Sequence, residues 1–73
     1  MTLDKFIEKI RYRSLEIIIT TSDNMELYNG TIGTYLTSVF RQNNGNKRLL
    51  LIYPGVDSLI IELAVRSDQL CEH

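Results

Sequence analysis

The first regular pattern of apolar residues lies at the N-terminus, in the segment LDKFIEKI. Its apolar residues occupy positions 3, 6, 7 and 10, with charged residues between them. A spacing of i, i+3, i+4 and i+7 places these side chains on one face of a helix. Thr2 is suited to cap the N-terminus, and Arg11 and Arg13 suit the negative end of the helix dipole. We therefore predict an amphipathic helix over residues 2 to 12.

Two pairs of apolar segments have the composition of β-hairpins. LEIIIT and MELYNG are separated by the polar segment TSDN, so the first hairpin is predicted to turn at Ser22 to Asn24. KRLLLIY and DSLIIELAV flank YPGV, which predicts a second hairpin. Pro54 suits position i+1 of a type I or II turn, and Gly55 would supply the positive φ that a type II turn requires.

The segment between the two hairpins can be read in more than one way. Ile32, Tyr35, Leu36 and Val39 have helical spacing, which favours a short helix within residues 31–40, followed by the polar segment RQNNGNK. Asn29-Gly30 is also a strong signal for a tight hairpin turn. We favour a strand that ends at Gly30 and passes into a helix, because TSDN already offers a turn upstream.

These elements predict one α+β domain over residues 1–73, in the order helix, β-hairpin, short helix, β-hairpin, with a four-stranded antiparallel sheet. A sheet covered on one side should alternate apolar and polar residues, but these strands do not. If Leu59, Ile61 and Leu63 face the core, an even-length turn at Pro54-Gly55 adds Leu50 and Ile52 to that side. The opposite face then carries a second apolar set, which we predict to be a protein interface: Ile18, Leu49, Leu51, Tyr53 and Ile60.

The charge of the chain argues against a general attraction to nucleic acid. Eight Lys and Arg oppose nine Asp and Glu, for a net charge of -1. Arg41, Lys47 and Arg48 are the residues that could still make a local nucleic-acid contact. The single cysteine, the absence of a signal-like N-terminus and the short apolar runs predict a reduced, cytoplasmic protein that does not enter the membrane.

Residues with catalytic or metal-binding chemistry are sparse. The single histidine, His73, is the last residue, and Cys71 and His73 together offer fewer ligands than a zinc site requires. Asp57 and Glu62 have no partner that their spacing would place nearby. Gly30-Thr-Ile-Gly33 could present backbone N–H groups to an anion, although glycines that mark a strand end and a helix entry explain it more simply. We expect no catalytic residues, no metal and no cofactor, and therefore no enzymatic activity.

The segments LDKFIEKI, ELYNGTIGTYL and LLLIYPGVDSLIIEL, in this order, resemble small uncharacterised proteins of phages and mobile elements of Gram-positive bacteria. The resemblance implies a regulator or inhibitor that binds a host protein, including anti-defence proteins. A homodimer through the sheet or a host protein partner is the expectation for the apolar face.

The alternative is an Sm-like RNA-binding oligomeric barrel. An N-terminal helix followed by LEIIITTSDNMELYNGTI is similar to the opening of the Sm1 motif, with Tyr28, Gly30 and Ile32 near the expected positions. The Asp-x-x-Met-Asn motif is replaced by Thr37-Ser-Val-Phe-Arg41, and no Ile-Arg-Gly or Lys-His sequence precedes the last strand. The RNA-contacting residues of that family therefore have no counterparts here.

Overall fold

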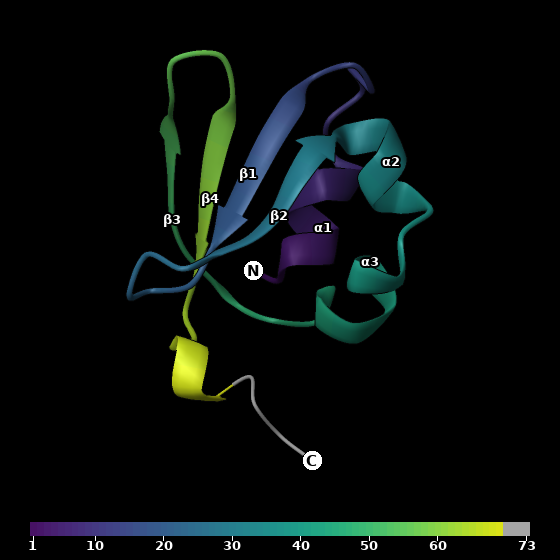
Figure 1. The fold of residues 1–73 in the computed structure, drawn as a ribbon. Coiled ribbons are helices and arrows are strands. Elements are labelled where there is room, and N and C mark those ends of the chain that lie inside the picture. The colour runs from purple at the N-terminus through teal and green to yellow at the C-terminus, as the bar shows by residue number, and fades with distance from the viewer. Residues whose placement is uncertain (70–73) are drawn as a thin grey trace.

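The computed structural model describes residues 1–69, which form a four-stranded sheet with three α-helices beside it (Figure 1). The helices group beside β1 and β2, whereas the hairpin of β3 and β4 projects away from them. This arrangement confirms the α+β class. In chain order the elements are α1 (Leu3–Glu8), β1 (Glu16–Thr20), β2 (Glu26–Thr31), α2 (Ile32–Leu36), α3 (Val39–Asn44), β3 (Leu49–Pro54), β4 (Leu59–Leu63) and the 3-10 helix η1 (Ser67–Gln69).

The first helix begins as predicted and ends earlier. The Thr2 hydroxyl accepts a hydrogen bond from the Lys5 N–H at 3.4 Å, which satisfies one of the free donors of the first turn. The helix then tightens, because the Ile10 N–H bonds to the Ile7 carbonyl three residues back. The α-helix therefore stops at Glu8, and the predicted extension to residue 12 is wrong.

The strand that ends near Gly30 passes into a helix, as we favoured, but two short helices follow in place of one. Thr31 caps α2 in a capping box with Thr34. Ser38 separates the helices, since its hydroxyl donates to the Tyr35 carbonyl at 2.7 Å and accepts from the Arg41 N–H at 3.2 Å. This break turns Val39 away from the predicted apolar face, leaving it 66% exposed. Residues 41–44, the first part of the polar segment RQNNGNK, lie in α3.

The sheet is mixed, with the strand order β2-β1-β4-β3. The two strands of each hairpin are antiparallel. The two central strands of the sheet, β1 from the first hairpin and β4 from the second, run parallel to each other. The prediction of a wholly antiparallel sheet is therefore wrong at its centre. Parallel neighbours require a long connection, and residues 32–48, which contain α2 and α3, provide the length between the hairpins.

The core lies between the helices and one face of the sheet. Ile61 and Leu63 face it, as predicted, while Leu59 is half-buried against it. The apolar sides of α1 and α2 face it as well. The fully buried set comprises Leu3, Ile7, Ile17, Ile19, Ile32, Tyr35, Ile61 and Leu63.

A β-bulge in β3 changes which of its side chains face the core. Leu49 pairs with Leu63, but the next partner of β4, Glu62, pairs with Leu51, so Leu50 is an extra residue. Leu49 consequently packs against the core, and Leu50 is 56% exposed. The predictions that Leu49 faces away from the core and that Leu50 belongs to it are both wrong, because they assumed uninterrupted alternation.

The two predicted turns have different outcomes. The first hairpin turns at Ser22 to Asn24 as predicted, and Asn24 adopts a left-handed φ of 72° there. In the second hairpin, Pro54 belongs to β3 and pairs with Leu59, and the Gly55 N–H donates to the Ser58 carbonyl at 2.7 Å. None of the glycines has a positive φ, so the proposed role of Gly55 in a type II turn is wrong.

Candidate protein-binding face

The face of the sheet opposite the buried core residues carries a continuous apolar row. Ile18 pairs with Ile60 on one side and with Asn29 on the other, and Ile60 pairs with Tyr53. Directly paired residues point to the same face, so these four side chains share one face of the sheet. We call this surface the outer face. Ile18 and Ile60 are half-buried among their neighbours, and Tyr53 is 37% exposed.

A second row on the outer face combines apolar and acidic side chains. Thr20 pairs with Glu26 in β2 and with Glu62 in β4, and Glu62 pairs with Leu51 in β3. Leu49 faces the core, so its neighbour Arg48 lies on the outer side. Arg48 is therefore on the same side as Leu51, which follows the bulge at Leu50. The Arg48 carbonyl accepts a hydrogen bond from the Ala64 N–H at 2.8 Å. The outer face thus has an apolar centre and charges along one end.

Strand β3 and its hairpin tip carry most of the exposed apolar surface of the sheet. Leu51 and Tyr53 lie on the outer face, whereas Ile52 pairs with Ile61 on the core side. The consecutive β3 residues Leu50, Leu51, Ile52 and Tyr53 each expose between 36% and 56% of their surface, and Val56 at the hairpin tip exposes 99%. Runs of large exposed apolar residues are unusual in isolated proteins and are typical of interaction surfaces.

The open edge of β3 is less suited to binding than the outer face. In an antiparallel pair, every second residue directs its N–H and C=O toward the neighbouring strand. Because Gly55 bonds to Ser58 of the other strand, Tyr53 and Leu51 also direct these groups toward β4, and Ile52 and Pro54 direct theirs outward. Pro54 has no N–H to donate, and the bulge interrupts the edge at Leu50. The start of the strand is already paired, since the Leu49 N–H donates to the Met1 carbonyl at 3.1 Å. The edge therefore offers few free hydrogen-bonding groups to an added strand.

The structure brings together most of the predicted interface residues. Ile18, Leu51, Tyr53 and Ile60 share the outer face, and Leu49 lies on the core side. The exposure of Leu50 and Ile52 was missed. The exposure of Leu50 follows from the bulge, which leaves no periodic trace in a run of four leucines and isoleucines. Ile52 pairs with Ile61 on the core side of the sheet, and it is exposed because β3 projects away from the helices (Figure 1).

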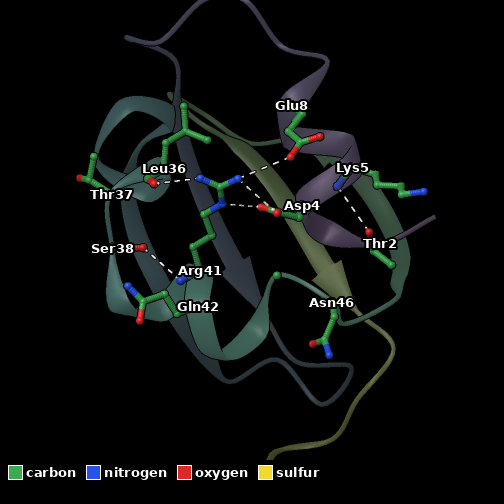
Figure 2. Close-up of a pocket in the computed structure, with 11 residues that line it drawn as sticks. Thr2, Asp4, Lys5, Glu8, Leu36, Thr37, Ser38, Arg41, Gln42 and Asn46 are labelled. Atoms are coloured by element: carbon green, nitrogen blue, oxygen red, sulfur yellow. Dashed lines mark hydrogen bonds and ion pairs between the residues drawn. The ribbon is translucent and has the colours of Figure 1, made fainter.

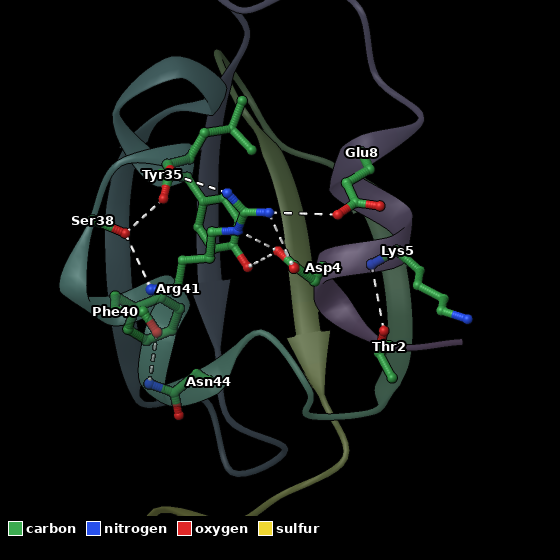
Figure 3. Close-up of polar contacts among 10 residues, drawn as sticks. Thr2, Asp4, Lys5, Glu8, Tyr35, Ser38, Phe40, Arg41 and Asn44 are labelled. Carbon is green, nitrogen blue, oxygen red and sulfur yellow. Dashed lines mark hydrogen bonds and ion pairs between the residues drawn. The ribbon is translucent and has the colours of Figure 1, made fainter.

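The predicted basic residues do not form one patch, because the Arg41 side chain is held by contacts with other residues of this chain (Figure 3). Its Nε donates to Asp4 Oδ1 at 2.8 Å, its Nη2 lies 3.3 Å from Asp4 Oδ2 and 3.4 Å from Glu8 Oε2, and its Nη1 donates to the Leu36 carbonyl at 3.0 Å. The bond to Asp4 raises the pKa of Arg41 above its ordinary value. Of the three predicted nucleic-acid contacts, only Lys47 and Arg48 remain free of such a network among the described residues.

Tyr35 extends this network into the core. Its hydroxyl donates to Asp4 Oδ1 at 3.2 Å. Burial, followed by the nearby Asp4 charge, raises the pKa of Tyr35 above its ordinary value, so the phenol stays protonated as a donor. The side chains of Asp4, Arg41 and Tyr35 thus join α1 to α2 and α3.

An open groove of about 730 Å³ lies between α1 and the segment from α2 to α3 (Figure 2). Asp4 and Glu8 line one side, and Ser38, Arg41 and Gln42 line the other. The charged groups at its base already pair with one another across the groove. Its geometry indicates a contact that holds α1 against α3.

The start of α2 cannot cradle an anion in this conformation. The Ile32 N–H donates to the Leu15 carbonyl at 2.9 Å, and the Gly33 N–H donates to the Arg13 carbonyl at 3.0 Å. The Thr34 N–H donates to the Thr31 hydroxyl at 3.2 Å. The Thr31 N–H donates to the Thr34 hydroxyl at 3.1 Å. The N–H groups of Thr31, Ile32 and Gly33 are therefore used within the fold, which supports the simpler interpretation of the glycines.

Other candidate chemical groups also remain separate. Within residues 1–69, no three His, Cys, Asp or Glu side chains are grouped so that they could hold a metal ion. Asp57 lies in the hairpin loop, and Glu62 lies on β4. Cys71 and His73 lie outside the described residues.

The Asp23 carboxylate joins the first hairpin turn to η1. It accepts hydrogen bonds from the Thr21 hydroxyl, from the Ser67 hydroxyl at 2.7 Å and from the Ser67 N–H at 3.1 Å. The hydrogen bond from Thr21, followed by that from the Ser67 side chain, lowers the pKa of Asp23 from 3.8 to about 2. The ionised carboxylate is therefore the form that stabilises this contact.

The lowered pKa predicts an acid-sensitive contribution of Asp23 to stability. Because the folded-state pKa lies below the unfolded value, the contribution is fully present above pH 3.8 and is lost as pH falls toward 2. We expect Asp23→Asn to lower the urea midpoint at pH 7 and to approach the wild-type midpoint at pH 2. Urea titrations at both pH values test this, and an equal difference at both values would contradict it.

No protein-family model matches the chain, and neither a curated protein nor a solved structure does so. Within residues 1–69, none of the helices has both the length and the apolar character needed to cross a membrane. The described strands form an open sheet with edges at β2 and β3 and with helices at residues 32–44. This arrangement differs from the closed barrel of the Sm-like alternative.

Proposed function

We propose that this chain is a non-enzymatic protein-binding module whose binding surface is the outer face. The observation that carries the proposal is the apolar row of Ile18, Ile60 and Tyr53, with Leu51 beside it, on the face opposite the core. Burying this surface against a partner would remove apolar area from water, which is the main favourable term in protein association.

The chemistry of the remaining surface also supports binding over catalysis. The groove beside α1 is lined by charges that already pair with one another, and the N–H groups at the start of α2 are used within the fold. The sequence resemblance to small proteins of phages and mobile elements points to a host protein as the target. A phage-encoded regulator or inhibitor of a host defence protein, acting in the cytoplasm without a cofactor, fits these features.

The substitution Ile60→Lys tests whether the outer face binds. We expect it to reduce capture of the partner from a lysate at least about tenfold, because a buried Ile contributes about 1.5–3 kcal/mol and an unpaired buried charge adds a cost. Quantitative affinity capture from cells of the source organism measures the effect.

Val39→Lys is the matched control. Val39 is an exposed apolar residue of α3, away from the outer face, so this variant should capture as much partner as wild type. A parallel sample treated with nuclease separates protein binding from RNA binding. Undiminished capture by Ile60→Lys, or loss of all bound protein after nuclease treatment, would refute the proposal.

A further inference from the structure

We infer that the loop between α1 and β1 binds single-stranded nucleic acid, with Lys9, Arg11 and Arg13 contacting phosphates and Tyr12 stacking on a base. The loop lies beside the start of α2, at the end of the sheet where β1 begins (Figure 1). It does not belong to the outer face, so the inference goes beyond the proposed function. It is carried by the concentration of positive charge in this loop and by the exposure of its side chains.

The segment KIRYR, residues 9–13, concentrates the positive charge of the chain. It holds three of the eight Lys and Arg and none of the nine Asp and Glu, so the rest of the chain has five positive side chains against nine negative ones. The acidic residues that flank it are Glu8, whose carboxylate pairs with Arg41, and Glu16, which begins β1. Local positive charge attracts a polyanion even where the whole chain is slightly acidic.

The charged groups of this loop are free to contact a ligand. Lys9, Arg11 and Arg13 are all exposed. Within residues 1–69, none of these three side chains forms an ion pair. A phosphate group would therefore not have to displace an internal partner in order to bind them.

The backbone of the loop is held in place by the rest of the fold. The Gly33 N–H donates to the Arg13 carbonyl at 3.0 Å, and the Leu15 N–H donates to the Tyr12 carbonyl at 3.2 Å. Ile10 packs against the core. A ligand would therefore bind a loop whose backbone is already ordered, which lowers the entropic cost of binding.

Tyr12 favours an unpaired base over a duplex or a membrane as the ligand. The residue is 67% exposed, and it takes no part in the ring contacts among Tyr28, Tyr35 and Phe40. Exposed aromatic rings beside basic side chains are typical of proteins that bind single strands, because an unpaired base can stack on the ring. The other apolar residue of the segment, Ile10, packs against the core, so the loop offers little apolar surface to a lipid bilayer.

Three phosphate contacts predict weak and salt-dependent binding. For single strands, the logarithm of the binding constant falls with the logarithm of the salt concentration by about 0.7 per contact, so three contacts give a slope of about −2. Raising the salt concentration from about 50 mM to about 200 mM should therefore lower the affinity about 20-fold. We expect a dissociation constant on the order of 10⁻⁴ M at physiological salt, at the weak end of nonspecific binding.

Fluorescence anisotropy of labelled oligothymidylate and labelled oligouridylate, titrated with the chain over a salt series, tests the inference on DNA and RNA. Arg11→Ala and Arg13→Ala should each lower the affinity and reduce the steepness of the salt slope by about 0.7. Tyr12→Ala should lower the affinity at least about fivefold and leave the slope unchanged, because stacking binds a base without releasing counterions. Tyr12→Phe keeps the ring and should bind as wild type does.

Replacing Lys47 and Arg48 together by alanine is the matched control. This variant removes two positive charges at the opposite end of α1 from the loop, where the Leu3 N–H donates to the Lys47 carbonyl at 2.8 Å. It should keep the wild-type salt slope and nearly the wild-type affinity. A loss as large as that of Arg11→Ala and Arg13→Ala would overturn the assignment to the loop.

The remaining outcomes also decide the inference. Undiminished binding by Tyr12→Ala would overturn the assignment of a single strand as the ligand. Binding to vesicles of anionic phospholipid, with no binding to either oligonucleotide at about 50 mM salt, would overturn the choice of ligand. These titrations use the purified chain and a surface other than the outer face, so their failure leaves the proposed function to be decided by Ile60→Lys and Val39→Lys.

Discussion

Replacing Tyr35 by alanine is expected to lower the free energy of unfolding by about 3–5 kcal/mol. The side chain is fully buried, and its ring packs against those of Tyr28 and Phe40, with centroids 6.0 Å and 6.3 Å away. A domain of this length is typically stable by about 4–11 kcal/mol, so the loss is a large share of the total. Urea denaturation followed by far-UV circular dichroism measures it.

Two further variants divide this effect into its parts. Tyr35→Phe keeps the ring and removes only the hydroxyl that donates to Asp4, so we expect a loss of about 1–3 kcal/mol. Tyr12→Ala is the control for removing a tyrosine from the surface, because Tyr12 is 67% exposed and should cost less than about 0.5 kcal/mol. A Tyr35→Ala variant as stable as Tyr12→Ala would contradict the packing described for α2.

The neighbouring residues Ile18 and Ile19 should differ strongly when each is replaced by alanine. Ile19 is fully buried in the core, and its removal leaves a cavity that costs about 2–5 kcal/mol. Ile18 is half-buried on the outer face, so its loss should cost about 1 kcal/mol in the monomer. Both midpoints are measured at low concentration, where association does not contribute to stability. Equal losses would mean that β1 does not present these two residues to opposite faces.

The sequence predicted the local elements because their signals are local. The apolar spacing around Phe6 and Ile7 found α1, and the polar segment at Ser22 to Asn24 found the first turn. The pairing of β1 with β4 could not be found in this way. It depends on how residues 32–48 return the chain across the sheet, and alternation within a strand does not encode the direction of its neighbour.

The candidate site was predicted in outline and misplaced at one strand. Successive residues of LLLIY are apolar, which predicted an apolar side chain on both faces of the strand. Tyr53 and Leu51 lie on the predicted second face. Leu49 was misplaced because one extra residue at Leu50 reverses the alternation for everything before it. The ion pair between Arg41 and Asp4 could not be predicted from the sequence pattern, because the two residues lie 37 positions apart in the chain.

The parallel pairing of β1 with β4 has a consequence for synthesis on the ribosome. Ile17 pairs with Leu59, 42 residues later in the chain (59 minus 17). As the nascent chain emerges, β1 can pair with β2 once residue 31 is made, but its other edge stays open until residues 59–63 appear. An unpaired apolar strand edge is a template for aggregation. Chains that stop before Leu59 would keep this edge open, so incomplete translation products of this protein should depend on chaperones to stay soluble.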